Sequence, residues 1–113
     1  MNFLIDTNIL IPLEPTSHID LGVNTDLALQ FHRLCSKSGN QVFIHPEIHN
    51  DLDRDANIER ATLRRTLVRR YSFLKSTPDP SILDVDVVGN PSKGSNDYVD
   101  NCLLASLKRD LVD

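Results

Sequence analysis

The chain has 113 residues, of which 40% are hydrophobic and 25% are charged, and this length and composition predict one folded domain and exclude an extended disordered chain. The formal net charge of −4 excludes a broad cationic surface for non-specific nucleic-acid binding. The apolar stretch at 3–13 is short and contains Asp6, so we expect neither a membrane span nor a secretory signal.

Basic side chains and cysteines are distributed unevenly along the chain. Residues 54–75 hold seven of the twelve basic side chains and only two acidic ones, a local net charge of +5. Cys35 and Cys102 lie within apolar helical patterns and form no Cys-x-x-Cys unit, which favours buried, reduced thiols. We therefore expect an intracellular, cytoplasmic protein that has no membrane partner.

The first half of the chain predicts two strands, each followed by a helix. Residues 2–5 form an apolar run before Asp6-Thr7-Asn8, a pattern typical of a buried strand that leads into a helix. A helix is predicted over about 19–38 and ends at Gly39-Asn40. Residues 41–44 predict a second strand, and the proline that follows favours the start of another helix. The helix before that strand is expected to bury one face, formed by Leu27, Phe31, Leu34 and Cys35.

The second half predicts a basic helix, an edge strand and a last helix. The basic helix is expected over about 58–75, and the alternation at 83–87 predicts a strand with one solvated face. A loop at 89–95 precedes a helix capped by Ser95 or Asn96. The expected apolar faces are Leu63, Leu67, Tyr71 and Leu74 on the basic helix, and Val99, Leu103 and Leu107 on the last one. Strands that alternate with helices predict an α/β fold, a three-layer α/β/α sandwich with a short, mostly parallel central sheet.

Four carboxylates are expected at one rim of this sheet, where parallel α/β sheets bind their ligands. They are Asp6, Glu47, Asp97 and Asp100. Gathered carboxylates repel one another unless a cation neutralises them, and hard oxygen ligands select Mg²⁺ or Mn²⁺. Such ions activate water and stabilise the charge that develops on a phosphate. The set favours metal-dependent phosphodiester hydrolysis, although each acid alone is explained as a helix cap.

Three segments of the chain resemble PIN-domain ribonucleases. Phe3-Leu4-Ile5-Asp6-Thr7-Asn8-Ile9-Leu10 resembles the opening of that family, in which an apolar strand delivers an acid followed by Thr or Ser and Asn. Residues 42–47 resemble its second strand and second acid, and residues 96–105 resemble the helix that bears its third acid. The resemblance covers essentially the whole chain. It implies that the Mg²⁺ or Mn²⁺ ligands are Asp6, Glu47 and Asp100, with Asp97 as an alternative or additional ligand, and it nominates Thr7 and Asn8 beside the ions.

The resemblance implies a metal-dependent endoribonuclease, the toxin of a bacterial toxin-antitoxin pair. Its expected partners are an RNA substrate, an antitoxin protein and a second copy of the chain. PIN domains continue into a further strand that ends in a Thr-x-Asp-like turn, whereas this chain ends at Leu111-Val112-Asp113. We therefore expect a PIN-like domain over 1–113 that lacks this strand, and Asp113 is not assigned as a ligand. The alternative is a catalytically inactive interaction module, or the N-terminal fragment of a larger protein.

Several polar residues near these acids have two interpretations each. Arg70 lies at the edge of an apolar helix face, where it either pairs with a carboxylate or binds a substrate phosphate. His45 and His49 have a spacing that can bind zinc, but a proline follows His45, so capping or surface roles are favoured. Asp51, Asp53 and Asp55 form a short acidic run that is expected to be solvated. The alternative for Asp51, which is one helical turn from Glu47, is a distant group behind the ligands.

Overall fold

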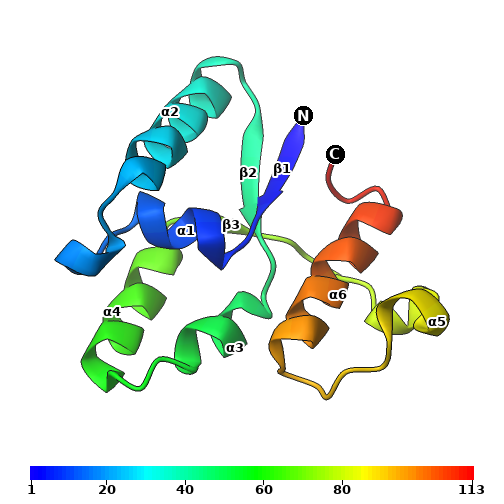
Figure 1. Cartoon of the computed structure of the whole chain (residues 1–113). Coiled ribbons are helices and arrows are strands. Elements are labelled where there is room, and N and C mark those ends of the chain that lie inside the picture. The colour runs from blue at the N-terminus through cyan, green and yellow to red at the C-terminus, as the bar shows by residue number, and fades with distance from the viewer.

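A computed structural model describes the backbone of residues 1–113 and every side chain except those of Ile19 and Val23. The elements of the first half are β1 (Asn2–Ile5), α1 (Thr7–Leu13), the 3-10 helix η1 (His18–Asp20), α2 (Val23–Lys37), β2 (Gln41–Ile44) and α3 (Ile48–Asp53). The elements of the second half are α4 (Ile58–Val68), β3 (Ser72–Phe73), the 3-10 helix η2 (Pro80–Ile82), α5 (Val85–Val88) and α6 (Asn96–Lys108) (Figure 1).

The three strands form one parallel sheet in the order β1-β2-β3. Phe3 lies opposite Val42, and Ile44 lies opposite Phe73. Parallel neighbours need long crossover connections, which α1 and α2 supply between β1 and β2, and α3 and α4 supply between β2 and β3. The structure therefore confirms an α/β fold with a small parallel sheet, in which the carboxyl ends of the strands share one edge.

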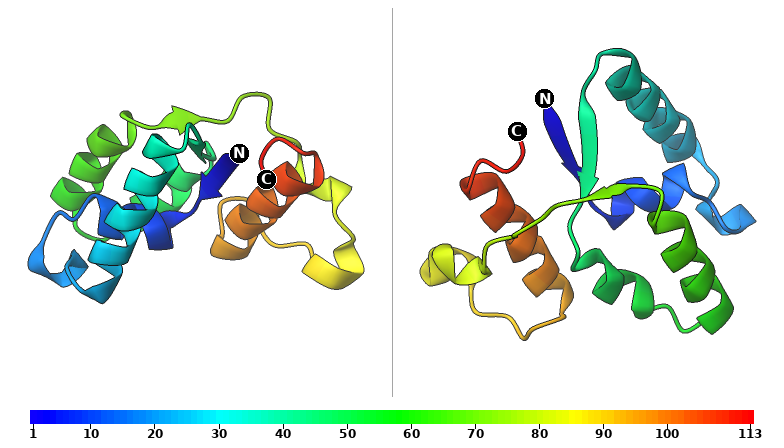
Figure 2. Two further views of the ribbon diagram at one scale, coloured as in Figure 1. Left: turned by 90° about the horizontal axis from the view of Figure 1, so that it is seen from above. Right: turned by 180° about the vertical axis from the view of Figure 1, so that it is seen from behind.

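Helices lie on two opposite sides of the strands. Helices α2 and α4 lie on one side, and α6 with α5 lies on the other (Figures 1 and 2). The amino and carboxyl ends of the chain lie next to each other, and the Asp113 backbone N–H donates to the Asn2 carbonyl oxygen at 2.8 Å. Helix α6 is thus held beside β1 by contacts at its far end.

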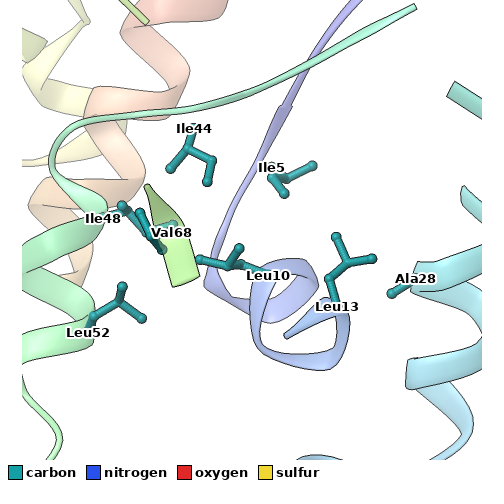
Figure 3. Packing of buried hydrophobic residues seen from close by; sticks show 8 residues of the cluster. All are labelled: Ile5, Leu10, Leu13, Ala28, Ile44, Ile48, Leu52 and Val68. Atoms are coloured by element: carbon teal, nitrogen blue, oxygen red, sulfur yellow. The ribbon is translucent and has the colours of Figure 1, made fainter. Parts of the chain in front are cut away.

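The main core joins the two strand-helix units of the first half to α4. Figure 3 shows the side chains that meet there, which come from β1, α1, α2, β2, α3 and α4. They are Ile5, Leu10, Leu13, Ala28, Ile44, Ile48, Leu52 and Val68. Burying a large aliphatic side chain contributes about 1.5 to 3 kcal/mol. This core fixes the end of β1 relative to α3. It thereby also fixes the positions of Asp6, which follows β1, and of Asp51, which lies in α3.

Helix α2 differs from its prediction in extent and in its buried face. It begins at Val23 after Gly22, and the short η1 precedes it. Of the predicted face, Cys35 is buried and Phe31 packs against the core, whereas Leu27 and Leu34 are 57% and 64% exposed; Ala28 is buried in addition. Residues 27 and 34 are seven positions apart, and so are residues 28 and 35, so each pair has the spacing of one helical face. Contact with α1 and the sheet, rather than periodicity, decides which pair is buried.

The predictions for 58–75 and 83–87 are wrong in part. The basic helix ends at Val68, and Ser72–Phe73 forms β3 because it pairs with the edge of β2. The expected edge strand is instead the short helix α5. The side chain of Asp84 starts this helix by accepting from the Asp86 N–H at 3.0 Å, and Gly89 ends it with φ +72°. Local capping overrides the alternating pattern there.

Several predicted local features are confirmed. The strands at 2–5 and 41–44 have the expected bounds, and Gly39 ends α2 with φ +71°. The Ser95 hydroxyl accepts from the Tyr98 N–H at 3.2 Å and caps α6. Cys35 and Cys102 are buried and free. In the part of the chain that the structure describes, helices are too short or too polar to cross a membrane.

Candidate functional site

One cleft of about 510 Å³ lies between the carboxyl end of β1, helix α3 and the first half of α6. Figure 1 shows these three elements converging at the same end of the molecule. The side chains that line the cleft are mostly polar or charged. They are Asp6, Thr7, Asn8, Ile11, Asp51, Leu52, Arg54, Asp55, Arg64, Asn96 and Asp100.

Asp6 stands where β1 ends and α1 begins. One of its carboxylate oxygens accepts from the Asn8 N–H at 2.9 Å and thereby caps α1. The other oxygen accepts from the Asn8 side-chain amide at 3.3 Å. Thr7 and Asn8 line the cleft beside it. Asp6 is therefore a helix cap that also lines the cleft.

Asp100 brings a second carboxylate to the cleft from α6. Partial burial raises its pKa, and the negative charges of Asp51, Asp6 and Asp97 raise it further. Asp97 is exposed in the first turn of α6 and lies outside the lining of the cleft. The structure thus brings Asp6 and Asp100 together as expected, and it places Asp97 at the periphery, where its charge still acts on Asp100.

Asp51, rather than Glu47, supplies the acid from the second strand-helix unit. Glu47 precedes α3, accepts a hydrogen bond from the Asn50 side chain and lies outside the lining of the cleft. It faces Cys102, whose pKa is raised to about 11 by burial and then by the charge of Glu47. Asp51 lies one helical turn further along and lines the cleft. Asp51 thus lines the cleft where Glu47 was expected, and Glu47 lies outside that lining.

Arg54 joins α3 to the start of α6 across the cleft. Its guanidinium forms an ion pair with Asp51 and donates to the side-chain oxygen of Asn96 and to the carbonyl oxygen of Gly94. The side chain of Arg54 is 34% exposed, and that of Asp51 is 17% exposed. A cation of the chain itself thus neutralises Asp51, one of the four acids that line the cleft.

Arg64 lines the opposite wall and is held by two carboxylates. It donates to both carboxylate oxygens of Asp20 at 2.9 Å and to Asp55 at 3.1 Å. Asp55 also binds Arg60. Hydrogen bonds within this network, chiefly from Arg60, lower the pKa of Asp55 to about 2. The network fixes η1 and the loop before α4 to the body of α4.

Arg70 lies away from the cleft, contrary to the expectation that it binds a substrate phosphate there. It forms an ion pair with Glu14, whose other carboxylate oxygen accepts from the Tyr71 hydroxyl at 2.9 Å. The carboxylate-pairing alternative is thus the one the structure contains. Arg70 follows the end of α4 and points toward α1, whereas Arg54 and Arg64 face the cleft.

His45 and His49 have separate structural roles. His45 is 2% exposed, and its Nδ1 accepts from the Glu47 backbone N–H at 3.0 Å. Burial lowers its pKa. The ring of His49 stacks on Phe73 with the ring centroids 5.5 Å apart. His45 is thus buried rather than on the surface, and its ring binds the backbone of Glu47, the residue that precedes α3.

The donor chemistry of the cleft fits a hard divalent cation. Asp6, Asp51 and Asp100, three of the four carboxylates that line it, offer oxygen donors. Burial chiefly raises the pKa of Asp100, and the negative charges of Asp51, Asp6 and Asp97 raise it further. Within the described residues, however, no three His, Cys, Asp or Glu side chains are arranged so that they already form a metal site. Asp51 pairs with Arg54, and Asp6 accepts a hydrogen bond from the side chain of Asn8. These contacts must change before the two carboxylates can share an ion.

The residues that sequence reasoning missed are Asp51 as a direct cleft residue, Arg54, Arg64 and Asn96. A signal for Asp51 exists: it precedes Leu52, a core residue that is 2% exposed, and successive helical positions are about 100° apart. Placing Leu52 in the core therefore turns Asp51 to one flank of α3. Arg54 and Arg64 carry no such signal, because their contacts to Gly94 and Asp20 span 40 and 44 residues.

Comparisons with known proteins leave the assignment to the structure and the residues. No family model matches the chain, and neither the curated proteins nor the solved structures compared with it give a match.

Proposed function

We propose that this protein is a divalent-metal-dependent endoribonuclease whose ligands are Asp6, Asp51 and Asp100. The observation that carries the proposal is the meeting of three carboxylates, from β1, α3 and α6, in one cleft. Arg54 compensates Asp51, but Asp6 and Asp100 add further negative charge to the same cleft, and like charges that lie close together raise the energy of the folded state. The cation is Mg²⁺ or Mn²⁺, which bind oxygen donors.

We also propose that the fold is PIN-like, a sandwich of helices on both faces of the short sheet. The parallel order β1-β2-β3 and the helices on two sides of the strands support it. The presence of Asp6, after β1, and of Asp100, on α6, in one cleft also supports it. RNA as substrate, the toxin role and an antitoxin partner rest on the resemblance of 3–10 and 96–105 to PIN domains, and buried free thiols support a cytoplasmic location.

The residues in and around the cleft have different roles in the proposed reaction. When bound, a divalent ion supplies an activated water and stabilises negative charge on the phosphate. Asn8 holds the carboxylate of Asp6 in position through its backbone and side-chain N–H groups. Thr7 and Arg64 form walls of the cleft that orient the RNA backbone. Asp97 contributes negative potential from the periphery, and Glu47 and Arg70 stabilise the fold.

The test compares Asp51→Asn with Glu47→Gln, two changes one helical turn apart that each remove one negative charge. We expect Asp51→Asn to lower the rate of RNA cleavage in Mn²⁺ at least about tenfold and Glu47→Gln to leave it within about twofold. Asp6→Asn and Asp100→Asn should behave like Asp51→Asn. Cleavage that persists in all three Asp variants, or that fails only in Glu47→Gln, would overturn the assignment.

A second candidate, a partner-binding module, is favoured by the position of β1 at the edge of the sheet, where, among the described residues, only Asn2 is hydrogen-bonded, to Asp113. β1 is an edge strand, and an apolar groove runs beside it. The groove is lined by Phe3, Leu4, Ile5, Asp6, Ile9, Leu103, Leu104, Leu107, Val112 and Asp113. Edge strands with apolar flanks accept further strands. Mn²⁺ binding that disappears in Asp6→Asn favours the nuclease, whereas a chain that binds no Mn²⁺ and cleaves no RNA favours the module.

A further inference from the structure

The contacts of Arg54 differ from those of the other arginines of the basic segment. Arg60 and Arg64 share Asp55, Arg65 pairs with Asp53, and Arg70 pairs with Glu14. These carboxylates stand outside the set proposed to bind metal. Arg54 alone among these arginines pairs with a proposed ligand, Asp51. A change in the charge or the partners of Asp51 therefore acts directly on the position of the Arg54 guanidinium.

Arg54 also has the donors and the exposure that phosphate binding requires. Two of its three partners are neutral oxygens of the segment that begins α6, the Gly94 carbonyl and the Asn96 side chain. Its guanidinium lines the cleft and remains about one-third exposed. A guanidinium binds phosphate oxygens through paired donors, as it does a carboxylate. Replacing Asp51 by a phosphate thus preserves the type of contact and the other two anchors.

The charges of the cleft make this exchange depend on the cation. Asp51 cannot serve both Arg54 and a divalent ion at full strength, because each competes for the same carboxylate oxygens. When an ion neutralises Asp6, Asp51 and Asp100, the attraction between Asp51 and Arg54 falls. The donors of Arg54 that now contact Asp51 would then be available to a phosphate in the cleft, whose negative charge a second positive group stabilises.

We propose that Arg54 is the substrate-positioning residue of the cleft, and that it exchanges Asp51 for a phosphate of the RNA when the divalent ion binds. The inference rests on the proposed function, because it takes the three carboxylates as ligands. It assigns Arg54 two opposite effects. The residue weakens the binding of the free metal ion and strengthens the binding of the nucleic acid.

The experiment measures both effects on the folded chain. Mn²⁺ binding is titrated calorimetrically, and binding of a fluorescein-labelled ten-nucleotide single-stranded RNA is followed by anisotropy in Ca²⁺. We expect Arg54→Gln to bind Mn²⁺ about three- to tenfold more tightly, because a nearby positive charge is removed. The same variant should bind the RNA about five- to tenfold more weakly. Arg54→Lys, which keeps the charge, should restore the wild-type affinity for Mn²⁺.

The matched control is Arg65→Gln, which removes the same charge from another Asp–Arg pair on the neighbouring helix. It should leave both affinities unchanged. Equal behaviour of Arg54→Gln and Arg65→Gln, or equal Mn²⁺ affinities of Arg54→Gln and Arg54→Lys, would overturn the exchange while leaving the nuclease proposal intact. Wild-type Mn²⁺ binding that Asp6→Asn does not reduce would instead overturn the nuclease proposal, and the exchange with it.

Discussion

Asp20 and Arg64 show how single ion pairs hold the wall of the cleft. Their side chains are 9% and 12% exposed, and Arg64 contacts both oxygens of Asp20 at 2.9 Å. Burial raises the pKa of Asp20, but hydrogen bonds from Thr16 and the contact with Arg64 outweigh it, so the pKa lies below its ordinary value. The pair joins η1 to α4, two elements that are far apart in the sequence.

We predict that Arg64→Ala lowers the free energy of unfolding by about 1 to 3 kcal/mol near neutral pH, because it leaves Asp20 without its cation. Urea unfolding measures this loss. The control Arg65→Ala removes an exposed pair and should have little effect. Asp20 stabilises the fold above about pH 4, and this contribution disappears as the pH falls through its lowered pKa. The difference between wild type and Arg64→Ala should therefore shrink in acid; a constant difference would argue against the pair.

Whole elements decide where the acids point, and α6 is the clearest case. It carries Asp100 and begins at the cap formed by Ser95. The buried side chains of this helix include Val99, Cys102 and Ala105, which set its rotation. The predicted face contained Val99, but Leu107 on that face is 48% exposed. Helical periodicity located the helix, and packing against neighbouring elements decided its rotation.

We predict that Ser95→Ala destabilises the protein by about 1 kcal/mol, the usual cost of losing an N-cap side chain. The first turn of α6 should fray, so amide hydrogen exchange over 96–100 should become faster while exchange in β2 stays unchanged. Ser92→Ala, an exposed serine in the same loop, serves as the control. Uniformly faster exchange in both segments would show that the cap supports the whole fold rather than this helix.

At the scale of the molecule, the charge of the basic segment is largely balanced by partners from elsewhere. Counting along 54–75 gives a net charge of +5, in which Asp55 is already included. Four of the six arginines of this segment pair with carboxylates outside it, which are Asp20, Asp51, Asp53 and Glu14. A continuous basic surface for RNA is therefore not formed. The cations that face the cleft are Arg54 and Arg64.

We accordingly predict a shallow salt dependence of RNA binding. If one or two phosphates are contacted, the slope of log K against log salt for a single strand is between about −0.7 and −1.4. Anisotropy titrations from about 50 to 300 mM KCl, at constant Ca²⁺, measure it over a range in which screening changes strongly. A slope steeper than about −3 would mean that the segment 54–75 binds RNA along its length.

Local chemistry determined a defined part of this protein. The apolar runs at 2–5 and 41–44, the glycine that ends α2 and the serine that caps α6 act through residues a few positions apart, and all are confirmed. The position of Asp6 between β1 and α1 is likewise determined locally, because a strand end followed by a helix start is a pattern of neighbouring residues. Strand β3 was missed because its only partner is β2, almost 30 residues earlier.

Only the tertiary structure decided which acids meet. Glu47 and Asp51 are one turn apart, and the sequence alone does not distinguish them. The buried position of Leu52 beside Ile48 turns Asp51 to the cleft and leaves Glu47 beside Asn50. The pairing of Arg54 with Gly94, and of Arg70 with Glu14, depends likewise on packing between distant segments. Residue types and local caps are encoded within a few positions, whereas the direction of a side chain depends on what its helix packs against.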